Sequence, residues 1–329
     1  MELARTRIVV ESVLALGGMA EVLRGRLEGP HGFVRPVVLK RMKRELLEDD
    51  ELRTMFLDEA RLLARIRHPH VAQVYGLADD DGATVLVMEH VPGPTLRAVL
   101  EAARQRGVRL HEELALALGL TLAETLTAIH ALTDDAARPL GVVHRDLHPS
   151  NVVVGDDGVL KLLDFGIARA ATAVHDTSTG VVKGTDGYMA PEQAAGERVG
   201  QGADVYALGI LLHEMLTGSH PFAAFDGLAL LDRLGAADGP APRAIVPSLP
   251  IALDALVVRA MSRSAGDRPS ASELASTLAL ELGRRGAVPT YDLVKRTVAS
   301  LFAAPEPARA ERGASETVTE DRTQVSTRR

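Results

Sequence analysis

The sequence predicts an α+β fold with two lobes, in which a small lobe rich in β-strands precedes a larger helical lobe. Two observations predict it. Short runs of β-branched residues dominate roughly the first ninety residues, and long apolar segments with helical spacing dominate the residues that follow. The composition fits a folded globular chain, because 46% of its 329 residues are hydrophobic and 25% are charged. A chain of this length can bury a sizeable core.

Three strands and one helix are predicted in the small lobe. The strands are RIVVESVLAL, RPVVLKRM and ATVLVMEHV, at residues 7–16, 35–42 and 83–91. Residues 50–66 (DELRTMFLDEARLLARI) repeat their apolar side chains at helical spacing, which predicts an amphipathic helix. A glycine pair in LALGGMAEV, at residues 14–22, indicates a hairpin tip whose backbone N–H groups can approach phosphate oxygens.

The large lobe begins after residue 91, where helical patterns replace strand patterns. Residues 111–132 (HEELALALGLTLAETLTAIHAL) and 204–218 (DVYALGILLHEMLTG) are apolar enough to be buried helices, the second of which ends at glycine. Two short strand-like runs lie between these helices, NVVVG at 151–155 and VLKLLDFG at 159–166.

The last part of the chain, residues 284–329, differs in composition and is predicted to be a tail. Residues 290–302 place Val294, Val298, Leu301 and Phe302 on one helical face, with Thr290 as the N-cap, so we expect one helix that docks on the large lobe or on a partner. A passive linker is the alternative. The remaining tail is expected to be disordered, with Thr317, Thr319 and Thr323 as candidate phosphorylation sites.

Charge and cysteine content exclude several classes of function. A net charge of −7 argues against a nucleic-acid-binding protein, which would carry a basic surface. With no cysteine, the chain has no disulfide, no cysteine-ligated zinc and no catalytic thiol, which fits a reducing cytoplasm. No uninterrupted apolar run reaches the roughly twenty residues that span a bilayer. We therefore expect a cytoplasmic protein without a membrane span.

The segment HRDLHPSN, at residues 144–151, carries the pattern most indicative of a reaction. Phosphoryl transfer needs a carboxylate that orients the attacking hydroxyl and a second group that holds magnesium. Asp146 and Asn151 have these types, a few positions apart on one loop. Asp164, in the DFG turn that follows, supplies a carboxylate that can bind a metal ion bridging nucleotide phosphates.

Other parts of the pattern are weak when taken singly. The glycine pair alone favours an ordinary turn, Lys40 alone a solvated strand end, and Glu59 alone a surface carboxylate, although Glu59 could pair with Lys40. The segment GTDGYMAPEQ adds Thr185 and an Ala-Pro-Glu triplet that ends at Glu192. The order of all these features along one chain is what makes the pattern decisive.

With this set of motifs, the chain resembles the eukaryotic-like (Hanks-type) protein kinases, and most of all the bacterial Ser/Thr kinases, over residues 8–282. The resemblance implies a bilobal protein-kinase domain at 8–283, with the small lobe at about 8–91 and the large lobe at about 92–283. It implies ATP and Mg²⁺ as cofactors, and Ser/Thr hydroxyls of proteins as acceptors. It also implies autophosphorylation in the segment that holds Thr172, Thr177, Ser178 and Thr179, where Arg145 would bind the new phosphate.

The resemblance also implies roles for single residues. Lys40 would contact the α- and β-phosphates and pair with Glu59, Asp146 would be the catalytic base, and Asn151 and Asp164 would hold magnesium. The nucleotide would be bound by the glycine-rich loop, the lysine and the hinge, at Leu14, Ala15, Gly17, Gly18, Val22, Lys40, Glu89 and Val91. The remaining implied roles are Met88 as gatekeeper, His90 in the hinge, Glu192 paired with Arg268, Asp204 bracing the catalytic loop, and His144 and His130 as core residues.

The chain departs from the family pattern at three positions. The first and third glycines of the glycine-rich loop are Ala15 and Ala20, which could weaken the phosphate contacts of the backbone. His148 replaces the usual lysine of the catalytic loop. We expect bound phosphates and Asp146 to keep His148 at least partly protonated, so that it donates to the transferring phosphate and counts as a catalytic residue. A histidine that only fills space is the alternative.

Two other functions are compatible with the same motifs. A pseudokinase that binds a nucleotide or a partner as a scaffold is favoured by the missing glycines and by His148, and disfavoured by the presence of Lys40, Asp146 and Asp164. A small-molecule kinase of related fold is disfavoured, because the segment around Thr185 receives a protein substrate in the family. The HPSN loop favours Ser/Thr over Tyr acceptors.

Overall fold

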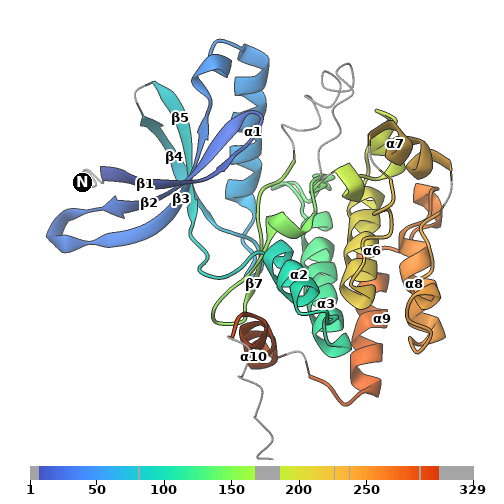
Figure 1. The fold of residues 1–329 in the computed structure, drawn as a ribbon. Helices are drawn as coiled ribbons and strands as arrows, with labels where there is room; N and C mark the ends of the chain where they lie inside the picture. The colour runs from blue at the N-terminus through green and yellow to red at the C-terminus, as the bar shows by residue number, and fades with distance from the viewer. Residues whose placement is uncertain are drawn as a thin grey trace, which may run out of the picture.

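Five strands form the sheet of the small lobe in the computed structural model, which describes residues 7–80, 82–166, 186–225, 227–236, 238–288 and 290–303 (Figure 1). They are β1 (Arg7–Leu16), β2 (Ala20–Glu28), β3 (Val34–Met42), β4 (Val74–Asp80) and β5 (Ala83–Glu89). Their order is β1-β2-β3-β5-β4, and all neighbours are antiparallel. The sequence did not predict β4, because Gly76, Asp79 and Asp80 give it little β propensity.

Helix α1 (Asp50–Arg65) flanks this sheet and matches the predicted helix closely. It begins at Asp49, whose carboxylate accepts hydrogen bonds from the backbone N–H groups of Glu51 and Leu52. Phe56, Ala60 and Leu63 are buried at helical spacing on one face of α1. The same packing fixes the direction in which the neighbouring Glu59 points.

The large lobe is helical, and the two-lobed α+β fold predicted from the sequence is confirmed (Figure 1). Its helices are α2 (Leu96–Gln105), α3 (Glu112–His130), α5 (Pro191–Ala194), α6 (Gly202–Thr217), α7 (Gly227–Ala236), α8 (Ile251–Ala260), α9 (Ala271–Arg284) and α10 (Tyr291–Phe302). The buried residues of α3 and α6 form the centre of the core, and α9 packs on α3. Within the described ranges, α3 alone is long and apolar enough to cross a membrane, but 67% of its apolar window is buried, as in a core helix.

A short hairpin of β6 (Val152–Val154) and β7 (Leu160–Leu162) connects the lobes at their junction. Leu162 donates its backbone N–H to the carbonyl of His70, at 2.8 Å, and its own carbonyl accepts from Ala72, at 2.9 Å. The backbone N–H of Leu163 donates to the carbonyl of Asn151, at 2.8 Å. These bonds hold the end of the catalytic loop beside the start of the DFG turn.

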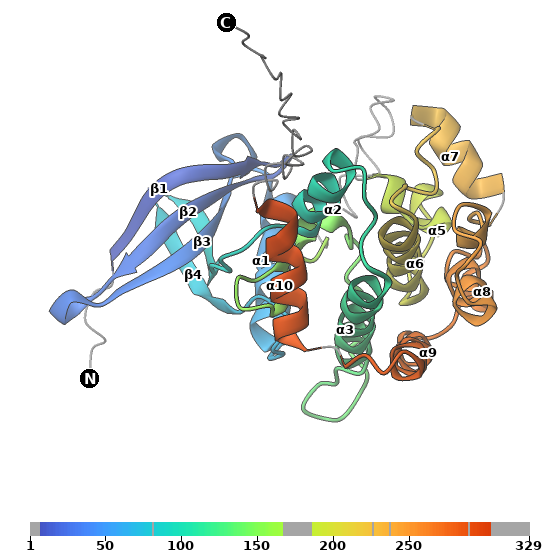
Figure 2. The ribbon, with the colours of Figure 1, turned by 60° about the horizontal axis from the view of Figure 1, so that its bottom comes forward.

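Helix α10 lies against α2 and α3, on the side of the large lobe that borders the sheet (Figure 2). Thr290 caps it by accepting from the backbone N–H of Leu293, and Val294 and Val298 are buried beneath it. The carbonyl of Tyr291 lies so close to Gly158 that a Cβ on Gly158 would overlap it. The expected helix therefore forms and docks on the large lobe.

Candidate active site

A buried ion pair joins α1 to the sheet at the lobe junction. The Nζ of Lys40 on β3 lies 2.6 Å from Oε1 of Glu59 and 3.5 Å from Oδ1 of Asp164 in the DFG turn. The Glu59 side chain is 1% exposed, and no partner of its Oε2 occurs among the described residues. The predicted Lys40–Glu59 contact is thus present. Lys40 also lies close to Asp164 of the large lobe, so the cluster joins the two lobes.

Burial and the neighbouring carboxylates have opposite effects on the pKa of Lys40. Burial would lower the pKa of Lys40, but the charges of Asp164 and Glu59 outweigh it and raise the pKa above its ordinary value. Lys40 therefore stays cationic throughout the physiological range. A cation fixed beside two carboxylates at the lobe junction is suited to binding the phosphates of a nucleotide.

The glycine-rich turn lies between β1 and β2. Gly17 donates its backbone N–H to the carbonyl of Ala20, at 2.9 Å, and a Cβ on Gly17 would meet that oxygen at 2.9 Å. Ala15 pairs with Val22 and Ala20 with Met42, and neither alanine has a positive φ. Because neither position has the left-handed backbone that favours glycine, alanine adds no such strain there.

The hinge begins at Glu89, the last residue of β5, and follows the gatekeeper position Met88. Met88 is 4% exposed and faces the core, as expected of a gatekeeper position. The carboxylate of Glu89 accepts from the backbone N–H of Gln73, at 3.0 Å, and from Nζ of Lys161, at 2.9 Å. Because the Glu89 side chain is held in this way, its contact with a nucleotide would come from its backbone.

The catalytic loop is ordered by its own polar side chains. The amide nitrogen of Asn151 donates to the carbonyl of Asp146, at 2.9 Å, and to its Oδ2, at 3.2 Å. The Oδ1 of Asn151 therefore remains available as a ligand. Gly166 lies against this loop, since a Cβ there would meet the Cβ of Asp146 at 2.7 Å. Residues Asp146, Asn151 and Asp164 are thus brought together, as the sequence predicted.

Two of these residues, Asp164 and Asn151, fit a magnesium site by their chemistry. Asp164 and Asn151 present carboxylate and amide oxygens, the hard ligands that Mg²⁺ prefers in proteins. Mg²⁺ also keeps several waters and shares phosphate oxygens, so two protein ligands suffice. The side-chain oxygens of Asp164 and Asn151 therefore suit the predicted Mg²⁺ ion.

Asp204, on α6, braces the catalytic loop from below, as expected. Its Oδ2 accepts from the backbone N–H of His144, at 2.8 Å, and its Oδ1 from that of Arg145, at 2.9 Å. Arg145 has a φ of +67°, a strained conformation that these bonds offset. The Nε2 of His130 also lies 2.8 Å from Oδ2 of Asp204, so His130 does more than fill the core.

His144 is a structural residue, in agreement with its sequence interpretation. It is 0% exposed, its Nε2 donates to the carbonyl of Leu163, at 2.8 Å, and its Nδ1 accepts from the backbone N–H of Asp146, at 3.3 Å. Burial lowers the pKa of His144, although the charge of Asp204 opposes this. A neutral ring whose two nitrogens are both engaged has no free atom for general-base work.

His148 is held in an orientation that the sequence did not predict. Its Nδ1 accepts from the backbone N–H of Ser150, at 3.2 Å, and its Nε2 lies 3.5 Å from Oδ2 of Asp146. Because Nδ1 is an acceptor, the neutral ring carries its hydrogen on Nε2, on the side of Asp146. If Nδ1 were protonated, its N–H would face the backbone N–H of Ser150, and the two donors would repel each other. The Nε2 of His148 is thus the nitrogen placed to donate, and the protonation expected from the sequence stays a prediction.

A second buried ion pair fixes the Ala-Pro-Glu segment. Nη1 and Nη2 of Arg268 donate to the two carboxylate oxygens of Glu192, at 2.7 and 2.8 Å, and the Arg268 side chain is 0% exposed. Three backbone carbonyls accept the remaining Arg268 donor contacts, and the guanidinium lies over the ring of Tyr206, 4.8 Å from its centroid. The predicted Glu192–Arg268 contact is present.

Several predicted residues lie outside the described ranges. They are Thr172, Thr177, Ser178, Thr179, Thr185, Thr317, Thr319 and Thr323. Arg145, the expected phosphate partner, has no hydrogen bond or ion pair from its guanidinium in the part of the chain that the structure describes. Its predicted role therefore stays a prediction.

Two neighbours of the catalytic loop were missed by sequence reasoning. The hydroxyl of Tyr188 donates to the carboxylate of Glu214 on α6, and its ring lies 6.4 Å from the ring of His148. The Nε of Arg97 on α2 donates to Oγ of Ser150, at 2.9 Å. The polar Tyr188 two positions before the Ala-Pro-Glu triplet was a usable signal, whereas nothing in the sequence singles out Arg97.

Comparison with known proteins places this geometry in a family. The sequence profile described as the protein kinase domain matches residues 9–277. The tyrosine-protein kinase MasK of Myxococcus xanthus is 40% identical over 266 residues, which cover 80% of this chain and 41% of MasK. The serine/threonine-protein kinase PknL of Mycobacterium tuberculosis is 36% identical over 80% of this chain and 62% of PknL.

A solved structure shows the same likeness in three dimensions. The PknI kinase domain of Mycobacterium tuberculosis superposes with a TM-score of 0.61 at 27% identity, covering 83% of this chain and 95% of that domain. The chain spans only 41% and 62% of the lengths of MasK and PknL.

Proposed function

The chain belongs to the protein kinase family, and from that premise we propose that it transfers the γ-phosphate of ATP to Ser and Thr hydroxyls of proteins, itself included. The observation that carries the proposal is the convergence of Lys40, Glu59 and Asp164 at the lobe junction, next to Asp146 and Asn151. Each has the type and surroundings that phosphoryl transfer needs.

Each residue takes one role in this proposal. Asp146 orients the acceptor hydroxyl and takes its proton as the oxygen attacks phosphorus. Lys40, kept cationic and held by Glu59, binds and orients the α- and β-phosphates. Asp164 and Oδ1 of Asn151 would hold magnesium, which when bound would supply positive charge to the phosphates. His148 donates from Nε2 toward the transferring group while remaining neutral.

Nucleotide recognition is proposed for the hairpin and the hinge. Leu14, Ala15, Gly17, Gly18 and Val22 would cover the nucleotide, and backbone groups of Glu89 and Val91 would contact the base. The absence of a positive φ at Ala15 and Ala20 supports a working loop, because alanine is not strained at either position. Cytoplasmic ATP makes the cytoplasm the proposed location.

Ser/Thr acceptors are proposed over Tyr, although MasK is named a tyrosine kinase. The HPSN segment and relatives such as PknL support this choice. The test is to incubate the purified chain with Mg²⁺ and labelled ATP, then to identify the modified residues by mass spectrometry. Phosphoserine and phosphothreonine are expected from the wild type, and none from Asp164→Asn. Phosphotyrosine alone would refute the acceptor assignment, and no transfer by folded wild-type protein would favour the scaffold.

A further inference from the structure

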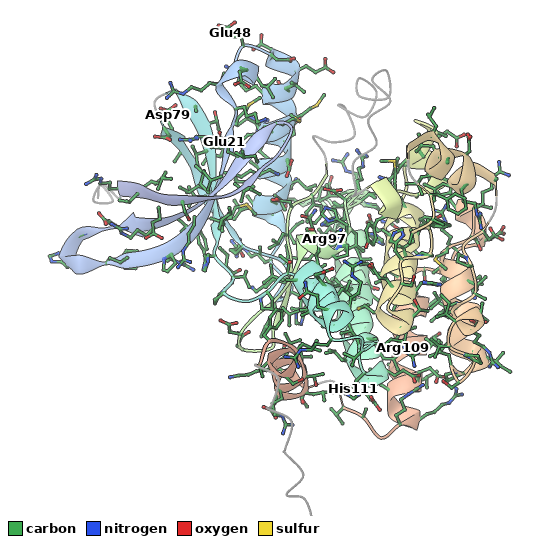
Figure 3. All side chains as sticks on the ribbon, in the orientation of Figure 1. Glu21, Glu48, Asp79, Arg97, Arg109 and His111 are labelled. Atoms are coloured by element: carbon green, nitrogen blue, oxygen red, sulfur yellow. The ribbon has the colours of Figure 1, made fainter. Side chains whose placement is uncertain are left out.

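An exposed arginine lies directly beside the catalytic loop. Arg97 is at the N-terminal end of α2, and its Nε donates to Oγ of Ser150, at 2.9 Å (Figure 3). Ser150 lies on the catalytic loop, four residues after Asp146 and immediately before Asn151. The guanidinium therefore lies against the catalytic loop that carries Asp146.

The base of Arg97 is held rigidly. Thr95 caps α2 by accepting from the backbone N–H of Ala98, at 3.2 Å, and pairs with Val153 as a β-bridge. On either side, Leu96 and Val99 are both 0% exposed. Such a fixed base, together with the Ser150 contact, reduces the conformational entropy that Arg97 loses when a ligand binds.

The charge of Arg97 is not neutralised within the described residues. None of their carboxylates lies within 4.0 Å of its guanidinium nitrogens. Glu214, which Arg97 influences electrostatically, is occupied by the hydroxyl of Tyr188. By contrast, Arg104 on the same helix forms an ion pair with Glu101, at 2.6 Å. Of these two arginines, only Arg97 combines the lack of a carboxylate partner among the described residues with a contact to the catalytic loop.

We propose that Arg97 recognises a carboxylate side chain that flanks the phosphorylated residue, so that the kinase prefers acidic substrate sequences. The proposal rests on the proposed function, of which it names the substrate class. Nε donates to Ser150, and the guanidinium also contacts the hydroxyl of Tyr188. The N–H groups of Nη1 and Nη2 that these two partners leave over match a carboxylate. Arginine stays charged at all physiological pH values, so the preference holds across that range.

Three of the chain's own candidate acceptors are flanked directly by a carboxylate residue. Asp176 directly precedes Thr177, Glu316 directly precedes Thr317, and Glu320 directly follows Thr319. Each of these threonines therefore carries the flanking carboxylate that Arg97 would bind. Autophosphorylation and recognition of acidic substrates would then use the same contact.

The test is a charge exchange between enzyme and peptide. Peptides with a single threonine are built with Asp, Ala or Lys at the positions from three before to three after it, plus one with phosphothreonine as a flanking residue. Initial rates are measured for the wild type, Arg97→Glu and the matched control Arg104→Glu, with kcat/KM for peptide and KM for ATP determined separately. All three proteins are used as the full chain.

The wild type and Arg104→Glu should favour Asp over Ala at one or two positions by about fivefold in kcat/KM. Arg97→Glu should lose that preference and favour Lys there, with KM for ATP unchanged. Equal use of Asp and Ala peptides by the wild type would overturn the inference, as would an unaltered preference in Arg97→Glu. A response to phosphothreonine alone would refute the carboxylate assignment. If the wild type phosphorylates no peptide and not itself, the proposed function itself fails.

Discussion

At the scale of single residues, the buried Glu59 depends on Lys40 for its charge. Burial raises the pKa of Glu59, and the attraction of Lys40 opposes that rise. In Lys40→Met the attraction of Lys40 is lost, so the pKa of Glu59 in the folded state rises further. The folded protein should then hold a proton on Glu59 at pH values where the unfolded chain does not. Stability then falls as pH rises through this window, because the folded state holds more protons. We expect a loss of about 3 kcal/mol at pH 8, and a smaller loss at pH 5.

Denaturant unfolding of Lys40→Met at the two pH values checks this expectation. The double variant Lys40→Met/Glu59→Gln carries no buried charge at the pair, so it should recover most of the lost stability and show no such pH dependence. An equal loss at both pH values would contradict the account of Glu59. The 1% exposure of Glu59 is the reason to expect a loss of stability, besides the loss of activity, when Lys40 is replaced.

His148 provides a second test at this scale, because its two nitrogens have different partners. Asn at this position can accept from the backbone N–H of Ser150 as Nδ1 does, whereas Gln can place an amide donor near the position of Nε2. We expect His148→Gln to keep most of the turnover and His148→Asn to lose about tenfold or more at saturating ATP. Because a neutral donor acts, the pH–rate profile of His148→Gln should match that of the wild type.

The opposite order of these two variants would show that the contact with Ser150 matters more than donation from Nε2. If the wild-type rate declines at high pH and the rate of His148→Gln does not, the result would instead support a protonated His148 ring, as expected from the sequence. Rates at saturating ATP and peptide, measured between pH 6 and 9, separate these outcomes.

At the scale of elements, α10 is attached through two buried valines. Val298 is 5% exposed beneath the helix, whereas Ala299 is exposed on the outer face. An aspartate at position 298 would be buried without a partner, at a cost of about 3 kcal/mol. We expect Val298→Asp to release α10, so that the amides of residues 291–302 lose roughly a hundredfold in protection from hydrogen exchange. The matched variant Ala299→Asp should retain protection, and protection retained in Val298→Asp would contradict the docked position.

The elements that sequence patterns predicted best are the long ones. Residues 50–66 carry helical spacing over several turns, residues 111–132 form a long apolar segment, and α1 and α3 form there. β4 was missed because pairing with β5, rather than its own propensity, holds Gly76 and two aspartates in a strand. Tertiary contact decided that element, and a single sequence contains no direct record of such contacts.

At the scale of the whole molecule, the candidate site combines segments far apart in the chain. Lys40, Glu59, Asp146 and Asp164 could be named from motifs, because each occupies a fixed place in an ordered set. The hydrogen bond from His130 to Asp204 spans 74 residues, and that from Arg97 to Ser150 spans 53. These pairs arise from how α2, α3 and α6 pack, and residue types alone do not reveal them.

The central claim is that Asp146 serves as the base of a phosphotransferase, and one comparison tests it most directly. Phosphate transfer from labelled ATP to the chain and to a threonine peptide is measured for the wild type, Asp146→Asn and Asp156→Asn. Asp156 is an exposed carboxylate on the turn between β6 and β7, so it controls for the loss of one negative charge. The account predicts a rate at least about a hundredfold lower in folded Asp146→Asn, and an unchanged rate in Asp156→Asn. Transfer by folded Asp146→Asn at the wild-type rate would contradict it.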